Sequence, residues 1–268
     1  MKINVFKSLA IAAAAVAMSV SCENSEVKTE KAEVNIKEQL TEDRTDSVSV
    51  TVNVEYPVSG IPEEACAGIC NVITETAFGS EYAGMSVQEA AEKWAAEFVS
   101  EYRETNRSII EDALAGANPE ETESNDLDNL GILTWENILD GQFTGRYGNV
   151  ASYTVTNYAY TGGAHGSTAV IAVNVNLETG KQVTEEDLFI PGYEENLSEI
   201  LTSHLRDALP DQDSYDALFV KDIRPNGNFT VSDQGVTYIY GQYEIGPYYL
   251  GIISVTAPWS ELVDLIRG

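Results

Sequence analysis

Hydrophobic and polar residues alternate along much of this chain, and the alternation predicts β-strands. Valine occupies every second position from Val48 to Val54, with polar residues between, which is the period of a half-buried strand. The run from Phe229 to Tyr240 contains a turn at Gly235 and predicts a β-hairpin. Further strand-like runs are expected at about 133–146, 149–160, 168–177 and 250–256.

Apolar residues spaced three and four positions apart predict helices between these strands. One such stripe begins at Cys66 and stops near Gly79. Ser86 with Glu89 forms a capping box that opens a longer helix. Additional helices are expected over 197–208 and after Pro258.

This order of elements predicts an α+β fold, because helices come early and strands with intervening helices follow. A regular alternation of strand and helix is missing, which argues against a doubly wound parallel sheet. We expect an antiparallel sheet with packed helices, arranged as two consecutive α+β subdomains at residues 47–159 and 160–268.

Residues 1–21 have the pattern of a bacterial signal peptide. Two lysines precede an apolar run from Leu9 to Val20, which is too short to span a membrane. Ser21 and Cys22 follow this run in a sequence that resembles a lipobox, in which the cysteine is diacylated on its thiol and becomes the new N-terminus. An ordinary secretory signal with an incidental cysteine is the alternative. We expect an outer membrane lipoprotein that faces either the periplasm or the outside of the cell.

Residues 22–46 are expected to form an acidic flexible tether between the lipid and the fold. Positions 23–46 hold eight acidic and four basic residues and almost no paired apolar positions. The acidic start after Cys22 resembles the export signals of surface-exposed lipoproteins of Bacteroidetes.

The whole chain is strongly acidic, with 43 acidic and 15 basic residues and a formal charge of −28. Removal of residues 1–21 takes away two lysines and no acids, which leaves −30. This charge opposes binding to nucleic acids or anionic lipids and favours cationic partners. An acidic surface that only keeps an exported protein soluble explains the charge equally well.

Candidate binding residues gather around two segments. The turn from Tyr160 to Gly166 holds His165, which either faces a partner or bonds the local backbone. The second segment, residues 238–249, holds five tyrosines, whose flat rings with polar tips suit binding to sugars or protein partners. Tyr238 and Tyr240 share one face of a strand, and that face could equally be part of the core. The residues expected to bind a ligand or partner are Tyr160, His165, Tyr240, Tyr243 and Tyr248.

Other residues offer weaker candidates for chemistry. Cys66 and Cys70 are either small core residues or a strained intrahelical disulfide. The acidic run 120–128 is either a solvated loop or a calcium site, although its spacing is not that of an EF-hand. His204 lies beside a helical stripe, where a boundary residue with a local partner is expected. We expect no catalytic residue, no metal and no cofactor, because no nucleophile elbow or metal-ligand spacing is present.

Several motifs resemble one bacterial extracellular family in order and spacing. They run from Tyr160–Gly166 through Asn174–Lys181 and Leu188-Phe189 to Asn228-Phe229, Gly235–Tyr240 and Tyr243–Tyr248. The chain is similar over about 160–265 to the extracellular domain of RsiV-type anti-sigma factors, which also accompanies PdaC-type peptidoglycan deacetylases. Residues 47–159 resemble, less sharply, the domain that precedes it in those proteins.

The resemblance implies binding of lysozyme, as in the anti-sigma factors. It does not imply signalling across a membrane or deacetylation. The sequence has no sigma-binding segment, and the two histidines lie 39 positions apart, which excludes the HxxxH pair of the deacetylases. We therefore expect a lipid-anchored, non-catalytic binding protein whose partner is a cationic lysozyme-like protein or envelope glycan. A glycan-acting enzyme that uses carboxylates, or a structural assembly lipoprotein, is the alternative.

The lipid anchor leads to a first prediction. Replacement Cys22→Ala removes the thiol that would be acylated, so the protein should move from the membrane fraction to the soluble fraction. Immunoblotting of fractionated cells measures this, and retention of the variant on membranes would count against lipidation.

Overall fold

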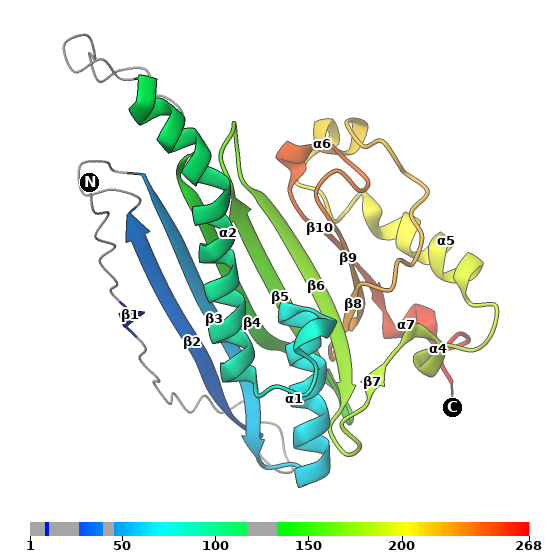
Figure 1. Cartoon of the computed structure of the whole chain (residues 1–268). Helices are drawn as coiled ribbons and strands as arrows, with labels where there is room; N and C mark the ends of the chain where they lie inside the picture. The colour runs from blue at the N-terminus through cyan, green and yellow to red at the C-terminus, as the bar shows by residue number, and fades with distance from the viewer. Residues whose placement is uncertain (1–8, 11–26, 40–45, 117–132, 268) are drawn as a thin grey trace.

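The computed structural model describes residues 9–10, 27–39, 46–116 and 133–267 (Figure 1). Two β-sheets lie side by side, and each carries its own helices and its own hydrophobic core. No helix among these residues is long and apolar enough to cross a membrane. The expected α+β class is confirmed.

The larger sheet is mixed. Its strands follow the chain order: β1 (Leu9–Ala10), β2 (Lys28–Gln39), β3 (Ser47–Ser59), β4 (Trp135–Tyr147), β5 (Val150–Tyr160), β6 (Ser167–Asn176) and β7 (Gln182–Val183). All neighbours are antiparallel except β3 and β4, which run parallel. A parallel pair needs a long crossover connection, and the two helices that follow β3 occupy it. The expected antiparallel pairing is therefore found for every pair of neighbours except this one.

Helices α1 (Glu63–Phe78) and α2 (Val87–Gly116) cover one face of this sheet, with the short 3-10 helix η1 (Ser80–Tyr82) between them (Figure 1). The alternating valines of β3 and the apolar stripe of α1 are buried together, as the periodicity predicts. The capping box is confirmed, since the Ser86 hydroxyl and backbone N–H both bond to the Glu89 carboxylate.

The smaller sheet is antiparallel and has the order β10–β9–β8. Its strands are β8 (Phe229–Val231), β9 (Gly235–Tyr240) and β10 (Ile253–Pro258). The helices of this part are α4 (Glu185–Leu188), α5 (Glu194–Leu205), α6 (Gln212–Asp216), the 3-10 helix η3 (Tyr248–Leu250) and α7 (Trp259–Leu262). The expected hairpin and the strand after residue 250 are therefore present.

The expected tether at 22–46 is wrong over Lys28–Gln39, which forms strand β2. Ala32, Val34 and Ile36 point into the core, while charged or polar residues occupy the other positions. The strand pairs with β3 along its length, and Glu38 forms an ion pair with Arg103 of α2. Residues 22–26 and 40–45, and with them the lipid attachment at Cys22, lie outside the described residues.

The chain passes from the first core to the second at a later position than the expected boundary at residue 160. Strands β5 and β6 form a hairpin across that boundary, with Ala159 opposite Ser167. The first core continues to Leu177, and the second begins at Phe189. Strand β6 belongs with the first core because its backbone hydrogen bonds are made with β5 of the larger sheet.

Buried and half-buried polar side chains fasten β8 to the larger sheet. The Ser152 hydroxyl accepts the Val231 N–H at 2.6 Å and donates to Asn174 Oδ1 at 2.6 Å. The Asn174 amide in turn donates to the Phe229 carbonyl at 2.9 Å. Asn228 accepts from the backbone of β6 at 2.7 Å and donates to it at 2.9 Å. We call Ser152, Asn174 and Asn228 the junction network.

The junction also needs a glycine on β4. A Cβ at Gly145 would collide with the Val231 carbonyl oxygen, so only glycine lets β8 approach this closely. The network therefore supplies side-chain hydrogen bonds where no continuous strand ladder joins the two sheets.

Replacement Ser152→Ala should lower the free energy of unfolding by about 1–3 kcal/mol, because it leaves the Val231 N–H and Asn174 Oδ1 buried without their partner. Chemical denaturation measures this. The exposed Ser203→Ala is the matched control and should change stability by no more than about 0.5 kcal/mol. Equal effects of the two substitutions would contradict the proposed importance of the junction.

Candidate functional site

The loop from Thr161 to Gly166 joins β5 to β6 and rests against the segment that follows β9. Gly162 and Gly163 have φ values of 95° and 96°, a region that favours glycine. The Thr168 N–H donates to the Gln242 side-chain oxygen at 2.8 Å. The site is thus built from one loop of each sheet.

His165 stacks on Tyr248, and this pair is the centre of the site. The ring centroids lie 4.0 Å apart with an interplanar angle of 26°. The Tyr248 hydroxyl donates to the Gly166 carbonyl at 2.8 Å, and His165 Nδ1 lies 3.1 Å from the same oxygen. The Tyr160 hydroxyl donates to the Gly163 carbonyl at 2.9 Å, which fixes the loop from its other side. The histidine therefore bonds the local backbone, one of the two alternatives that the sequence left open, and its ring is exposed; its contact with a partner stays a prediction.

Exposed aromatic rings continue from this pair over the surface. Tyr243 lies 5.7 Å from Tyr248 between ring centroids and is 59% exposed, in the left-handed backbone region at φ 63°. Tyr249 and Phe219 are 70% and 64% exposed on adjoining segments, and the Phe219 N–H donates to the Ile245 carbonyl.

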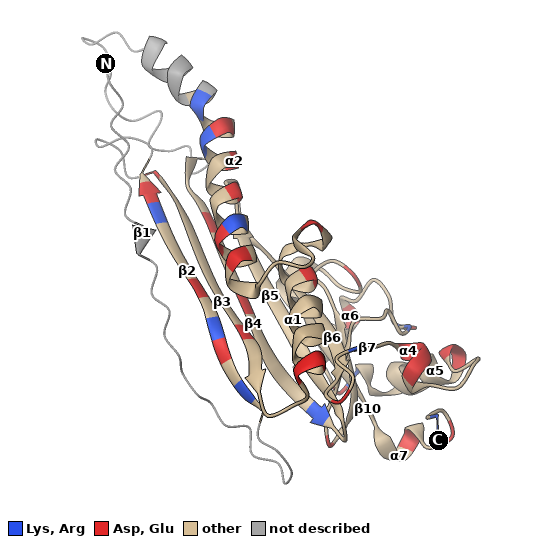
Figure 2. Ribbon diagram, turned by 60° about the horizontal axis from the view of Figure 1, so that its bottom comes forward, with Lys and Arg blue, Asp and Glu red and all other residues tan. Residues whose placement is uncertain are grey.

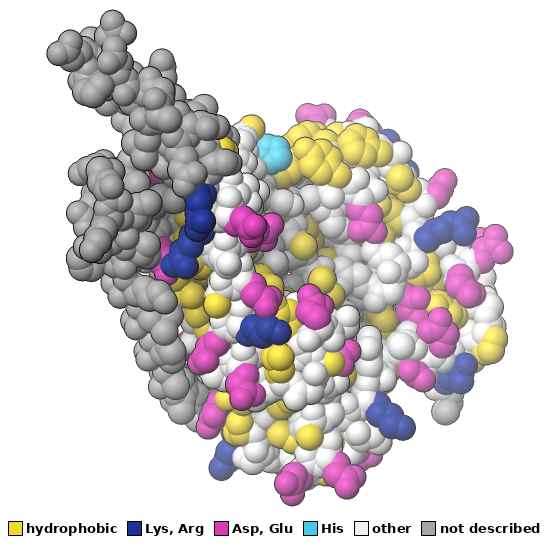
Figure 3. Space-filling model, viewed as in Figure 1, with side chains coloured by type: hydrophobic (Ala, Val, Ile, Leu, Met, Phe, Trp, Pro, Cys, Tyr) yellow, Lys and Arg dark blue, Asp and Glu magenta, His cyan; other side chains and the backbone are white. Residues whose placement is uncertain are grey.

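Figure 3 shows a histidine beside a large apolar surface at the top of the molecule. We call the following residues the aromatic patch: His165, Phe219, Tyr243, Tyr248 and Tyr249. Single exposed apolar residues are ordinary, but three neighbouring rings, those of His165, Tyr248 and Tyr243, with two further exposed rings on adjoining segments are typical of a binding surface.

Tyr240 does not belong to this patch, so its expected role in binding is wrong. It is buried in the second core, and its hydroxyl donates to the Arg224 carbonyl at 2.9 Å. Burial raises the pKa of its hydroxyl above the usual range. Tyr238 is buried as well, because alternate positions of β9 face the core.

A groove beside Tyr249 and the residue Phe219 were not predicted from the sequence. The groove holds a volume of about 470 Å³ and is lined by Ala208, Leu209, Pro210, Asp211, Ser214, Tyr249, Leu250, Ile252 and Ile253. The only sequence signal for Phe219 is an apolar pair placed directly before charged residues, which does not distinguish a surface residue from a core residue.

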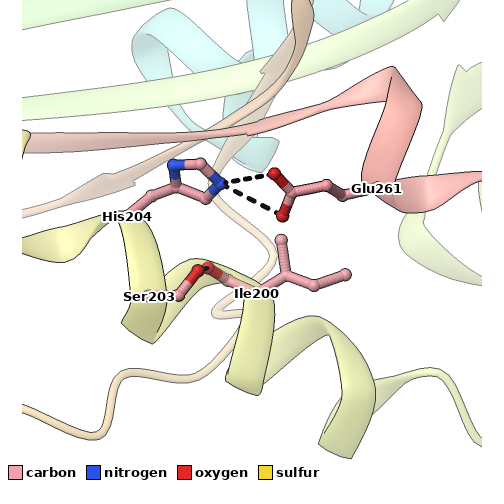
Figure 4. Close-up of polar contacts among 4 residues, drawn as sticks. All are labelled: Ile200, Ser203, His204 and Glu261. Atoms are coloured by element: carbon pink, nitrogen blue, oxygen red, sulfur yellow. Dashed lines mark hydrogen bonds and ion pairs between the residues drawn. The ribbon is translucent and has the colours of Figure 1, made fainter.

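His204 has a structural partner, as the sequence predicts. Its Nε2 lies 3.1 Å and 3.2 Å from the two carboxylate oxygens of Glu261 (Figure 4). The neighbouring Ser203 hydroxyl donates to the Ile200 carbonyl at 2.7 Å, so it is not paired with the histidine. The ion pair joins α5 to α7 rather than activating a nucleophile.

Within the part of the chain that the structure describes, no three His, Cys, Asp or Glu side chains are grouped closely enough to hold a metal ion. The acidic run considered for calcium, residues 120–128, lies outside that part.

The two cysteines of α1 are free thiols. The Cys66 and Cys70 sulfurs lie 3.0 Å and 3.6 Å from the Pro57 carbonyl oxygen and donate to it. Burial raises the pKa of both thiols, that of Cys70 to about 12. A thiol with a raised pKa is a poor nucleophile at neutral pH, so these cysteines are packing residues.

This arrangement defines an α+β protein with a surface suited to binding. Residues 186–260 match the family model DUF3298, which is described as a protein of unknown function. The matched residues lie inside the region 160–265, where the motifs resemble a known family. The finer assignment to RsiV-type or PdaC-type proteins stays a prediction.

Solved structures with the same fold come from two bacteria. A crystal structure of a DUF3298 family member from Bacteroides fragilis is similar with a TM-score of 0.77 and 21% identity, over 91% of this chain and 95% of that chain. A DUF3298 family protein from Pseudomonas aeruginosa gives a TM-score of 0.62 and 15% identity, over 90% and 94% of the two chains. Comparison with curated proteins found no match. Identities this low establish the fold alone.

The raised pKa values predict slow alkylation of the folded protein. Because the thiolate is the reactive form, Cys66 and Cys70 should react with iodoacetamide at pH 8 much more slowly than after unfolding in denaturant. Mass spectrometry of digested samples measures the labelled fraction. Rapid labelling of the folded chain, or a mass that shows a disulfide, would contradict this description.

Proposed function

We propose that this chain is a lipid-anchored, non-catalytic binding protein of the cell envelope, and that its binding surface is the aromatic patch. The observation that carries the proposal is the group of exposed rings around the His165–Tyr248 stack. Aromatic rings provide a large contact area at a low cost in side-chain entropy, which is why they dominate binding hot spots.

The centre of the patch is held in place by contacts within the chain. The Tyr248 ring is fixed by its stack on His165 and by the hydrogen bond of its hydroxyl to Gly166. A surface that is already ordered loses less conformational entropy on binding, so more of the contact energy contributes to affinity. Both histidines hold structural positions, one in this stack and one in the ion pair with Glu261, which favours binding over acid–base catalysis.

A cationic, lysozyme-like protein is the partner that we propose. The family resemblance implies lysozyme binding, and the formal charge of −28 complements a basic protein. Figure 2 shows acidic residues on strands and helices of both parts of the molecule, including β2, α2, α4 and α7. The negative electrostatic field of these residues speeds association with a cationic partner and weakens as the salt concentration rises. The apolar rings supply the short-range contacts.

The patch also suits the rings of an envelope glycan, which stack on flat aromatic faces. This is the second candidate, and it differs from the first in salt dependence, because an uncharged sugar does not respond to the acidic field. We propose that the acylated Cys22 anchors the protein in the outer membrane, on either the periplasmic or the outward-facing side.

Calorimetry with hen lysozyme tests the protein partner. The mature protein should bind at micromolar concentration at moderate salt, and Tyr243→Ala should weaken binding roughly 30-fold, the effect of about 2 kcal/mol at a hot spot. Tyr147→Ala is the matched control, because Tyr147 is a tyrosine 48% exposed at the opposite end of the sheet. It should leave the affinity unchanged.

No binding of lysozyme would remove this partner, and titration with peptidoglycan fragments would then test the glycan. Peptidoglycan incubated with the protein should release no products. Release that a carboxylate substitution abolishes would replace the binding function with an enzymatic one.

A further inference from the structure

We infer that the aromatic patch lies at the end of the molecule that points away from the membrane. This inference rests on the proposed anchoring at Cys22 and adds to it the direction in which the binding surface faces. It follows from the strand at Lys28–Gln39, which stands where a long tether was expected.

The connection between the lipid and the fold is short. Six residue steps separate Cys22 from Lys28, the first residue of β2. A fully extended chain spans at most about 3.5 Å per residue, so the start of β2 is held within about 20 Å of the acylated cysteine. A flexible tether that ran to residue 46 would instead allow any orientation.

The register of the sheet places the patch at the other end. Lys28 lies opposite Ser59, whereas the far end of β2, at Gln39, lies opposite Ser47. From there the register continues across the sheet, with Val48 opposite Trp135 and Glu136 opposite Tyr160. Tyr160 begins the loop that carries His165, so the patch is level with the far end of β2. Figure 1 shows the β5–β6 connection at one end of the sheet and the arrowhead of β3 at the other.

The length of β2 exceeds the length of the connection. Its 12 residues span about 40 Å at 3.3 Å per residue. The patch could reach the bilayer only if the sheet lay flat on the membrane. That position would bring a strongly acidic chain, including α2 with its excess of acidic residues, against the anionic headgroups, which is unfavourable. An upright orientation keeps this charge in solvent.

The orientation has a consequence for the partner. A macromolecule as large as a protein, or a polymer layer that lies away from the bilayer, reaches the patch without contact with lipid. The sheet then lies between the anchor at Cys22 and the binding surface, and the length of its strands keeps the two apart.

Energy transfer to labelled lipids tests the orientation. The lipidated protein, purified from bacterial membranes, carries a fluorophore at Ser59→Cys or at Ala164→Cys, two exposed positions at opposite ends of the sheet. Cys66 and Cys70 label slowly, because their pKa values are raised, and the unsubstituted chain measures this background. Each sample is reconstituted in vesicles whose headgroups carry an acceptor.

Transfer should be several-fold more efficient from Ser59→Cys than from Ala164→Cys. Equal transfer would mean that the sheet lies flat, and stronger transfer from Ala164→Cys would mean that the patch faces the bilayer; both results overturn the inference. Flotation of the vesicles separates this from a failure of the anchor, because an unlipidated chain does not float. Calorimetry with lysozyme tests the partner independently of either result.

Discussion

The two sheets of this protein are held together by a few buried or half-buried polar side chains, and the site depends on that attachment. The smaller sheet presents the three-residue strand β8 to the larger one, and Ser152, Asn174 and Asn228 provide the hydrogen bonds that a continuous ladder would otherwise make. Buried backbone groups need partners, so this network fixes the position of β8 as well as stabilising it. Gly145 contributes by leaving space for the Val231 carbonyl.

The binding surface is a consequence of this junction. One sheet contributes the loop with His165 and the other contributes Tyr243 and Tyr248, and the rings meet only because the sheets are fixed side by side. The hydrogen bonds from Tyr248 to Gly166 and from Thr168 to Gln242 extend the junction to the surface. A partner that binds across both loops would therefore also stabilise the contact between the two sheets.

Most of the regular structure could be predicted from local patterns. The valines of β3 and the capping box of α2 each encode their own element, because strand period and helix capping depend on residues close in sequence. The strand at Lys28–Gln39 was missed, because its short apolar series is surrounded by charges. Its stability comes from pairing with β3 and from the contact between Glu38 and Arg103, which are 65 positions apart. No local signal shows such a partner.

The candidate site, like the fold, could be predicted from the sequence only in part. The sequence by itself determined that His165 stands in a glycine turn, that a tyrosine-rich segment follows β9, and that the whole chain is acidic. Only the tertiary structure decided that His165 stacks on Tyr248 while Tyr240, three residues before Tyr243, is buried. It also decided that this surface lies at the opposite end of the sheet from Lys28. The reason is that composition and periodicity report on neighbours along the chain, whereas the face a side chain presents is set by strands and loops that are distant in sequence.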